Sequence, residues 1–225
     1  MGLYDINGNA IVAGGGESSV LSGKKWAVCG DSITSGEHSE KDENGNYKTY
    51  DWFIAKRNNM TLYRDGISGT KMSNTGNSHD FSVNRYKNIP SDCDYITLWF
   101  GINDGAEFGT IDDTENTTQY GAYNVVISYL IYNHPNAKIG LIVSHDIGTK
   151  ADVIRNIAKK YGLGIFDIQG DVKIPFWADW KHERTYVDKE IADFRMANWL
   201  ADGQHPNVEG YRQISTSMEA WMRTL

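Results

Sequence analysis

Short apolar runs alternate with segments of helical periodicity along most of this chain. From residue 24 onward, continuous apolar runs of a few residues are typical of buried strands. Elsewhere apolar side chains recur every three or four residues, which predicts helices over 120–131, 153–158 and 208–221, the last with Asn207 as its N-cap. The strand candidates are Lys24–Cys29, Met60–Tyr63, Tyr95–Phe100, Lys138–Val143 and Gly164–Ile168.

This alternation predicts one α/β domain over residues 24–225. Strands that alternate with helices pair in parallel, because each parallel strand returns through a crossover connection. We therefore expect a layered α/β/α domain. Ahead of it, residues 1–13 alternate around an Asn-Gly pair and predict a small hairpin, and the Gly- and Ser-rich residues 14–23 predict a linker.

The composition fits a folded domain and disfavours two classes of partner. The chain has 225 residues, of which 40% are hydrophobic and 23% are charged, enough to bury a full core. Its net charge of -7 disfavours nucleic acid and anionic membranes, because both bind basic surfaces. No apolar run predicts a membrane span, and the N-terminus lacks the pattern of a secretion signal. Three expectations remain open: an intracellular protein, one whose signal has been removed, or part of a larger exported assembly, in any oligomeric state.

The cysteines and most of the histidines predict neither a metal site nor a cofactor. Cys29 should end the first strand and Cys93 should precede another, which puts them at opposite edges of the sheet as free thiols. Four further histidines lie in polar segments that we expect to be exposed, and their spacing resembles no metal site. These are His38, His79, His134 and His182.

Small polar motifs follow three of the predicted strands and precede the last helix. The carboxyl ends of parallel strands meet at one edge of a sheet, where α/β domains bind their ligands, so we expect these motifs to lie together. Each alone is explained as a turn or a helix cap, whereas the ordered set is not. The motifs are GDS at 30–32, Gly66 and Gly69 in RDGISGTKMS, Gly101, Asn103 and Asp104 in WFGINDG, and Asp202 and His205 in ADGQHPN.

With these motifs the sequence resembles the SGNH hydrolases, also called GDSL esterases and lipases. The resemblance runs from Lys24 to the C-terminus and leaves out residues 1–23 and most of 171–201. It implies a three-layer fold with a flavodoxin-like, mostly parallel sheet of five strands. It also implies functional roles: Ser32 as nucleophile, His205 as base, Asp202 as its support, and Ser32, Gly69 and Asn103 as the oxyanion hole.

The residue types in the motifs suit ester hydrolysis through an acyl-enzyme. A serine hydroxyl needs an adjacent base, and an imidazole that is held by a carboxylate supplies one. The spacing of Asp202 and His205 lets one tight turn present both side chains. The anion that forms on the carbonyl oxygen needs preorganised donors, each worth about 3 kcal/mol. The backbone N–H groups of Ser32 and Gly69 and the side-chain amide of Asn103 are candidates.

Other residues near the motifs have more than one interpretation. Asp31 and Asp104 are expected to hold turns by hydrogen bonds rather than to catalyse. His145, in VSHD after the fourth strand, is the main rival for the base, and we interpret it as a substrate contact or a structural histidine. Trp177 and Trp180, in IPFWADWKHERTYV, fit a substrate wall, a lid, or a packed or subunit contact.

Together these features predict a serine esterase, and in particular an O-deacetylase of acetylated carbohydrate that needs no cofactor. The chain is polar and rich in aromatic residues, and it lacks a long apolar surface segment that would indicate a lipid substrate. We expect residues 37–47 and 174–187 to govern substrate choice. A short-chain lipase or thioesterase is the alternative within the family. A binding or structural module that keeps the fold without catalysis is the alternative outside it, although the complete set of motifs favours an enzyme acting on a small ester.

Overall fold

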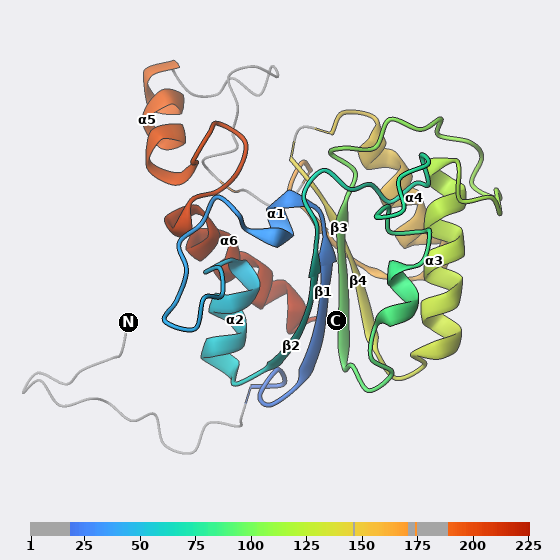
Figure 1. Ribbon diagram of the computed structural model, residues 1–225, viewed down its shortest axis with the longest axis horizontal. Coiled ribbons are helices and arrows are strands. Elements are labelled where there is room, and N and C mark those ends of the chain that lie inside the picture. Colours follow the sequence, from blue (N-terminus) through green and yellow to red (C-terminus); the bar gives the residue numbers. More distant parts are fainter. Residues whose placement is uncertain (1–18, 146, 171–173, 175–188) are drawn as a thin grey trace, which may run out of the picture.

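The centre of the computed structural model, which describes residues 19–145, 147–170, 174 and 189–225, is a sheet of five strands (Figure 1). The strand order is β2-β1-β3-β4-β5, and every neighbouring pair is parallel. This confirms the predicted flavodoxin-like fold, with a sheet that is parallel at every pairing rather than mostly parallel. The strands are β1 (Lys25–Gly30), β2 (Thr61–Gly66), β3 (Tyr95–Phe100), β4 (Lys138–Val143) and β5 (Gly164–Asp167).

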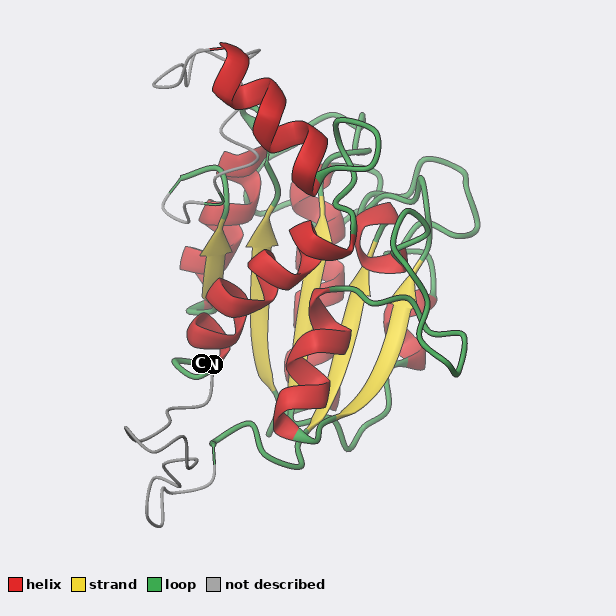
Figure 2. Ribbon diagram, turned by 90° about the vertical axis from the view of Figure 1, so that its left-hand side faces the viewer, coloured by secondary structure: helices red, strands yellow, loops and turns green. Residues whose placement is uncertain are grey.

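Helices cover both faces of the sheet and complete three layers (Figure 2). The layer of α2 and α6 lies on one face, and the layer of α3 and α4 lies on the other (Figure 1). The helices are α1 (Ser32–Ser35), α2 (Tyr50–Asn58), α3 (Gln119–Asn133), α4 (Lys150–Tyr161), α5 (Lys189–Trp199) and α6 (Val208–Met222), with one 3₁₀ turn, η1 (Arg85–Asn88).

Alternation along the strands divides the core into two parts. On β1, Trp26 and Val28 face the layer of α2 and α6, whereas Ala27 and Cys29 face the layer of α3 and α4. The central strand β3 is buried at every position, since helices cover it on both sides. This double burial explains why its sequence, YITLWF, is a nearly continuous apolar run.

All five predicted strands and all three predicted helices are present, with differences of a few residues at their ends. Asn207 caps α6, as predicted, by accepting hydrogen bonds from the backbone N–H groups of Glu209 and Gly210. Periodicity does not predict α1, α2 or α5. In α2 the pattern is obscured because the charged Asp51 is fully buried, where its carboxylate pairs with Arg64 at 2.7 Å.

Two expectations about individual side chains have different outcomes. Cys29 and Cys93 are both buried free thiols, as predicted. His134 was expected in an exposed segment, and that prediction is wrong, because the residue is 4% exposed. It ends α3, where its backbone N–H donates to the carbonyl of Leu130 and the chain turns back toward the sheet.

Several predictions concern residues outside the described ranges. These are the hairpin of residues 1–13, the first part of the linker, and the aromatic segment that contains Trp177, Trp180 and His182. The last residues of the predicted linker are described, and Leu21 among them is fully buried in the core. These residues therefore pack against the domain.

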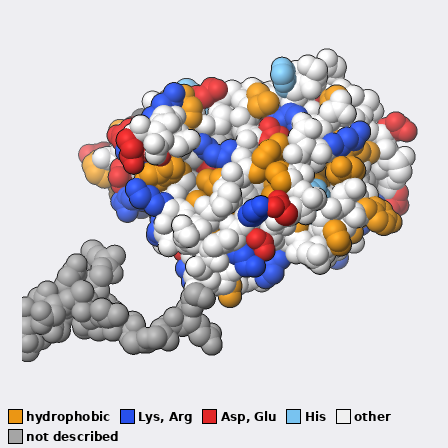
Figure 3. Space-filling model, turned by 60° about the horizontal axis from the view of Figure 1, so that its bottom comes forward, with side chains coloured by type: hydrophobic (Ala, Val, Ile, Leu, Met, Phe, Trp, Pro, Cys, Tyr) orange, Lys and Arg blue, Asp and Glu red, His pale blue; other side chains and the backbone are white. Residues whose placement is uncertain are grey.

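The described surface carries charges of both signs. Basic and acidic side chains are interspersed on the face that Figure 3 shows. Within the described ranges, each helix is too short or too polar to cross a bilayer.

Candidate active site

The loops after β1, β2 and β3, which carry Ser32, Gly69 and Asn103, leave the same edge of the sheet. The strand register aligns Gly30, at the end of β1, with Gly66 of β2 and Trp99 of β3. The loop after β2 is also tied to the end of β1, because the N–H of Ile67 donates to the carbonyl of Gly30 at 3.2 Å. This is the edge at which parallel α/β sheets bind ligands.

Ser32 begins the short helix α1 directly after β1. Asp31 caps this helix, and its carboxylate accepts a hydrogen bond from the N–H of Ile33 at 3.1 Å. Asp31 is fully buried, and burial raises the pKa of its carboxyl to about 7 despite that hydrogen bond. The expected turn-holding role of Asp31 fits this geometry. The turn leaves Ser32 8% exposed.

A chain of two hydrogen bonds joins Ser32, His205 and Asp202. The Nε2 of His205 lies 2.9 Å from Oγ of Ser32, and its Nδ1 lies 2.7 Å from Oδ2 of Asp202. A carboxylate only accepts hydrogen bonds, so Nδ1 carries the proton and Nε2 is left as an acceptor for the serine hydroxyl. The neutral imidazole is thereby held in the tautomer that a general base requires.

The turn that carries His205 also holds Asp202 in its ionised form. Oδ1 of Asp202 accepts from the backbone N–H groups of Gln204 at 3.1 Å and His205 at 2.8 Å. Partial burial alone would raise the pKa of this carboxyl, but the hydrogen bonds from His205 and Gln204 lower it to about 2. Asp202 is therefore an anion throughout the neutral range.

Gly69 and Asn103 lie on neighbouring loops of the same edge. Gly69 is exposed with φ of 75°, and a Cβ there would meet no protein atom within 4 Å. The left-handed backbone, rather than crowding inside the protein, therefore favours glycine. The side-chain amide of Asn103 donates to the carbonyl of Thr70 at 3.2 Å. Because the amide nitrogen carries two hydrogens, the second remains for a ligand.

Arg85, which the sequence analysis missed, clamps the loop that carries Gly69. It is 7% exposed and forms an ion pair with Asp65 at 2.9 Å. Its guanidinium also donates to Oγ1 of Thr70 at 2.9 Å and to the carbonyl of Gly30 at 3.3 Å. One buried cation thus joins the ends of β1 and β2 to the loop. The available signal was Asp65 in the motif RDGISGTKMS, just after the predicted strand Met60–Tyr63, because a carboxylate that becomes buried at a strand end needs a partner.

Asp104 fastens the same loop from the other side. Its two carboxylate oxygens accept from the backbone N–H groups of Met72 at 3.0 Å and Ser73 at 2.9 Å, and the residue is 2% exposed. The expected structural role of Asp104 fits these contacts. The loop after β2 is consequently held by a buried cation and a buried carboxylate.

His145 lies at the same edge, after β4, and is 8% exposed. Burial, with a smaller contribution from nearby His205, lowers the pKa of its ring to about 3. A ring that loses its proton at such a low pH is neutral at physiological pH and a weak base. Its interpretation as a substrate contact stays a prediction.

His38 lies unexpectedly close to the pair of Asp202 and His205. These three residues place potential metal-ligand atoms within 4.8 Å of one another. However, the rings of His38 and His205 are stacked with an angle of 14° between their planes. Imidazole binds a metal through a lone pair in the plane of its ring, so two nearly parallel rings would have to rotate before sharing an ion. The arrangement fits ring packing better than metal binding.

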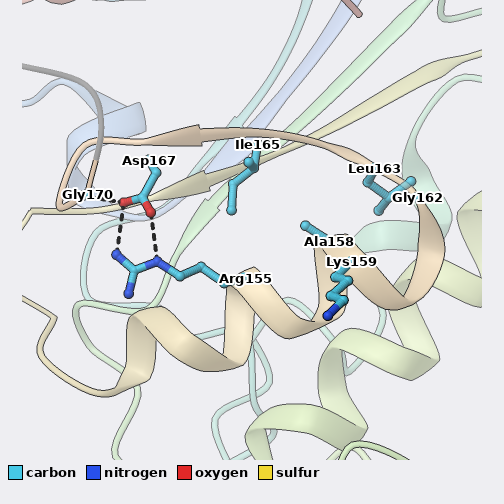
Figure 4. Close-up of a pocket in the computed structure, with 8 residues that line it drawn as sticks. All are labelled: Arg155, Ala158, Lys159, Gly162, Leu163, Ile165, Asp167 and Gly170. Atoms are coloured by element: carbon cyan, nitrogen blue, oxygen red, sulfur yellow. Dashed lines mark hydrogen bonds and ion pairs between the residues drawn. The ribbon is translucent and has the colours of Figure 1, made fainter.

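A separate hollow lies between α4 and β5 (Figure 4). There Nε of Arg155 donates to Oδ2 of Asp167 at 2.7 Å, and the N–H of Gly170 donates to Oδ1 at 2.6 Å. In the sheet, β5 lies three strands from β1, about 14 Å at the usual strand spacing. Arg155 and Asp167 pair with each other in this hollow, which does not extend the site around Ser32.

Comparisons with known proteins identify the family of this chain and structures that share its fold. The model of the GDSL-like Lipase/Acylhydrolase family matches residues 28–213. A comparison with curated protein sequences finds no match.

Among solved structures, a protein from Lactobacillus plantarum has a TM-score of 0.71 at 22% identity, with 90% of this chain and 98% of that chain covered. A protein from Bacteroides ovatus described as a GDSL-like lipase has a TM-score of 0.64 at 18% identity, covering 91% and 100%. A carbohydrate esterase family 2 enzyme from Myceliophthora fergusii, which also has a carbohydrate binding domain, has a TM-score of 0.53 at 14% identity, covering 88% and 66%. At these identities the likeness concerns the fold.

Proposed function

Because the chain belongs to the GDSL-like lipase/acylhydrolase family, we propose that it hydrolyses carboxylic esters with Ser32 as its nucleophile. The observation that carries the proposal is the pair of hydrogen bonds from Ser32 to His205 and from His205 to Asp202. Nucleophile, base and orienting carboxylate are within hydrogen-bond reach of one another, as this chemistry requires.

In the first half of the reaction, Oγ of Ser32 attacks the ester carbonyl and forms a carbon–oxygen bond. Its proton passes to Nε2 of His205, which lies 2.9 Å away. The imidazolium that forms is stabilised by Asp202, whose low pKa keeps it ionised. His205 then gives the proton to the leaving alcohol as the ester carbon–oxygen bond breaks, which leaves an acyl group on Ser32.

The negative charge on the carbonyl oxygen meets donors on three loops. The backbone N–H groups of Ser32 and Gly69 and the amide of Asn103 are the donors in this proposal. Arg85 and Asp104 hold the second loop in place, so its N–H does not have to be ordered during the reaction. Each donor is expected to contribute about 3 kcal/mol to lowering the barrier.

In the second half, water replaces the alcohol. His205 takes a proton from water, whose oxygen attacks the acyl carbon, and returns that proton to Oγ of Ser32 as the acid leaves. No cofactor takes part in either half of the proposed reaction.

For the substrate, we propose an acetyl ester on a carbohydrate. An acetyl group needs little apolar pocket, so the surroundings can bind the sugar through polar loops and aromatic rings. The polar loop of residues 37–47 borders the site through His38. The fold is shared with a carbohydrate esterase, which supports this substrate class without identifying the sugar.

The nucleophile is tested by replacing Ser32 with alanine. Ser32→Ala should abolish hydrolysis of p-nitrophenyl acetate, and a fluorophosphonate probe should label the wild type at Ser32 alone. Ser128→Ala, on α3 in the opposite layer, is the matched control and should keep activity and labelling. Turnover by Ser32→Ala, or labelling at another residue, would contradict the proposal and favour a non-catalytic module.

The substrate class is tested with a series of acyl chains and with acetylated polymers. Activity should fall steeply from acetyl to octanoyl esters. Trp177→Ala or Trp180→Ala should weaken deacetylation of acetylated xylan more than hydrolysis of a small aryl acetate, because only the polymer reaches remote contacts. A preference for long chains would instead indicate a lipase or thioesterase.

A further inference from the structure

The ring of His38 lies flat against the ring of His205. Their centroids are 4.2 Å apart, and the ring planes differ by 14°. Nδ1 of His38 also lies 3.8 Å from Oδ2 of Asp202, the oxygen that holds His205. Both imidazoles therefore lie near the same carboxylate oxygen, with His205 within hydrogen-bond distance of it and His38 farther away. His38 belongs to the loop between α1 and α2, and His205 to the segment between α5 and α6, so two distant parts of the chain meet here (Figure 1).

The residues on both sides of His38 are anchored. Before it, the carboxylate of Glu37 accepts a hydrogen bond from Oγ of Ser68 at 2.6 Å. After it, Oγ of Ser39 donates to the carbonyl of Lys48 at 2.9 Å. The stacked ring is thus presented by a held turn, although its side chain is 40% exposed.

The groups around the two rings make the charge of His38 matter. Asp202 stays ionised, because its hydrogen bonds lower its pKa to about 2. His145 follows β4, which lies two strands from β1 in the sheet. Burial keeps His145 neutral, and it lies close enough to His205 for their charges to interact. Glu37 precedes His38 on its own loop. Tyr211 of α6 also interacts with Asp202, and it stays neutral because burial raises the pKa of its hydroxyl well above the ordinary value.

Turnover requires positive charge to develop on His205. A neutral His38 permits this, and its ring covers one face of the imidazole. A protonated His38 has the opposite effect, because it places a like charge 4.2 Å from the His205 ring and attracts the carboxylate that supports it.

We propose that His38 is a positioning residue of the esterase site, which packs against His205 and has to be neutral for His205 to act as base. The inference rests on the proposed function. Two imidazoles, rather than one, then have to lose a proton before Ser32 attacks, and activity falls more steeply toward acid pH than it would with His205 alone.

The experiment measures the pH dependence of kcat/KM for p-nitrophenyl acetate in the wild type and three variants. His38→Phe keeps a flat ring that carries no proton, and His38→Ala removes both the ring and the charge. His79→Phe makes the same replacement at an exposed histidine on another loop and serves as the matched control. The rate of fluorophosphonate labelling at Ser32 is followed in parallel, as a readout that needs no turnover and also reports a folded site.

At the acid end, the wild type and His79→Phe should lose about a hundredfold in kcat/KM per pH unit, and His38→Phe about tenfold. At pH values where the histidines are neutral, His38→Phe should stay within about twofold of the wild type, whereas His38→Ala should lose about two- to tenfold through the missing ring contact. Labelling rates should follow the same profiles.

Three results would overturn the inference. An acid limb in His38→Phe as steep as in the wild type, with normal labelling, removes the role of His38 and leaves the esterase proposal intact. Loss of labelling in His38→Phe at every pH shows that an uncharged ring does not replace His38. A wild type that neither hydrolyses esters nor labels at Ser32 contradicts the proposed function, and the inference about His38 falls with it.

Discussion

The two halves of the candidate site are held in opposite ways. Around Ser32, the supporting charges lie inside the protein, with Asp31 at 0%, Asp104 at 2% and Arg85 at 7% exposure. Around His205 they lie at the surface, where the side chain of Asp202 is 41% exposed and that of His205 is 16% exposed. The half of the site around Ser32 is thus anchored by buried residues, whereas the half around His205 is carried by turns at the surface.

This difference matches what each half has to do. Oxyanion donors act best when they are fixed before the reaction in a site from which water is excluded. A base gains and loses protons in every cycle, so contact with solvent is compatible with its work. We therefore expect changes in the buried half to alter stability together with rate, and changes in the exposed half to alter rate alone.

The largest effect is expected for the base. His205→Ala should lower kcat/KM by about 10⁴-fold or more, because it removes the side chain proposed to accept the proton of Ser32, while the free energy of unfolding changes little. Asp202→Ala should cost less, since the carboxylate orients the imidazole without taking its proton. Ester hydrolysis and urea unfolding are the measurements. If His145→Ala were equally damaging with its fold intact, the assignment of the base would be wrong.

The next effect is on stability in the buried half. Arg85→Leu should lower the free energy of unfolding by about 3–5 kcal/mol, because it leaves Asp65 as a buried charge without its cation. Arg212→Leu removes the cation of an exposed pair with Glu209 and should cost under about 1 kcal/mol. Urea unfolding of both variants measures the two losses of stability. Equal costs would show that burial does not distinguish the two ion pairs.

A smaller effect on rate is expected at Gly69. Gly69→Ala should lower kcat about ten- to a hundredfold, because a methyl group there projects into open space beside the proposed oxyanion hole and strains the backbone that is proposed to donate to it. Gly162→Ala is the matched control. Gly162 also has positive φ and open surroundings, but it ends α4 and is not one of the proposed site residues. Both should lose about 1–2 kcal/mol of stability from the left-handed backbone. A loss of kcat in both variants would point to a general effect on folding.

The last effect is a dependence of stability on pH. Burial raises the pKa of Asp31 to about 7 in the folded state, well above its value in an unfolded chain. The folded protein therefore keeps a proton between about pH 4 and pH 7 that the unfolded chain releases, and stability from this group falls as pH rises through that window. An asparagine at position 31 can still cap α1 but carries no charge.

Relative to the wild type, the free energy of unfolding of Asp31→Asn should therefore be unchanged below about pH 4 and higher by up to about 4 kcal/mol above pH 7. Thermal unfolding of both proteins across this range is the measurement. A variant that is less stable than the wild type at pH 8 would show that the carboxylate of Asp31 is needed in its ionised form.

The sequence was most informative where secondary structure and chemistry follow from local pattern. The central strands are apolar runs such as Tyr95–Phe100, and α6 has both a clear apolar face and a cap at Asn207. The polar motifs were found because parallel strands deliver their carboxyl ends to one edge. That single topological rule brings together loops far apart in the chain.

What was missed depends on contacts between distant residues. Nothing local distinguishes Arg85 from a surface arginine until Asp65 and Thr70 are seen around it. His38 lies in a polar loop, and only the fold places its ring on His205. Similarly, α2 buries a charged residue and so lacks the pattern of an amphipathic helix. Whether a charged residue is buried therefore depends on the partner that the fold provides as well as on the local sequence.

The hydrogen bond between Ser32 and His205 joins positions 173 residues apart. During synthesis the ribosome releases the serine, its turn and most of the sheet long before the histidine has been made. Because the turn at Asp202 follows all five strands in the chain, translation makes His205 available to Ser32 only after the whole sheet has been synthesised. A polypeptide that stops before residue 205 therefore carries the proposed nucleophile without its proposed base, and by the mechanism proposed above it should not hydrolyse esters.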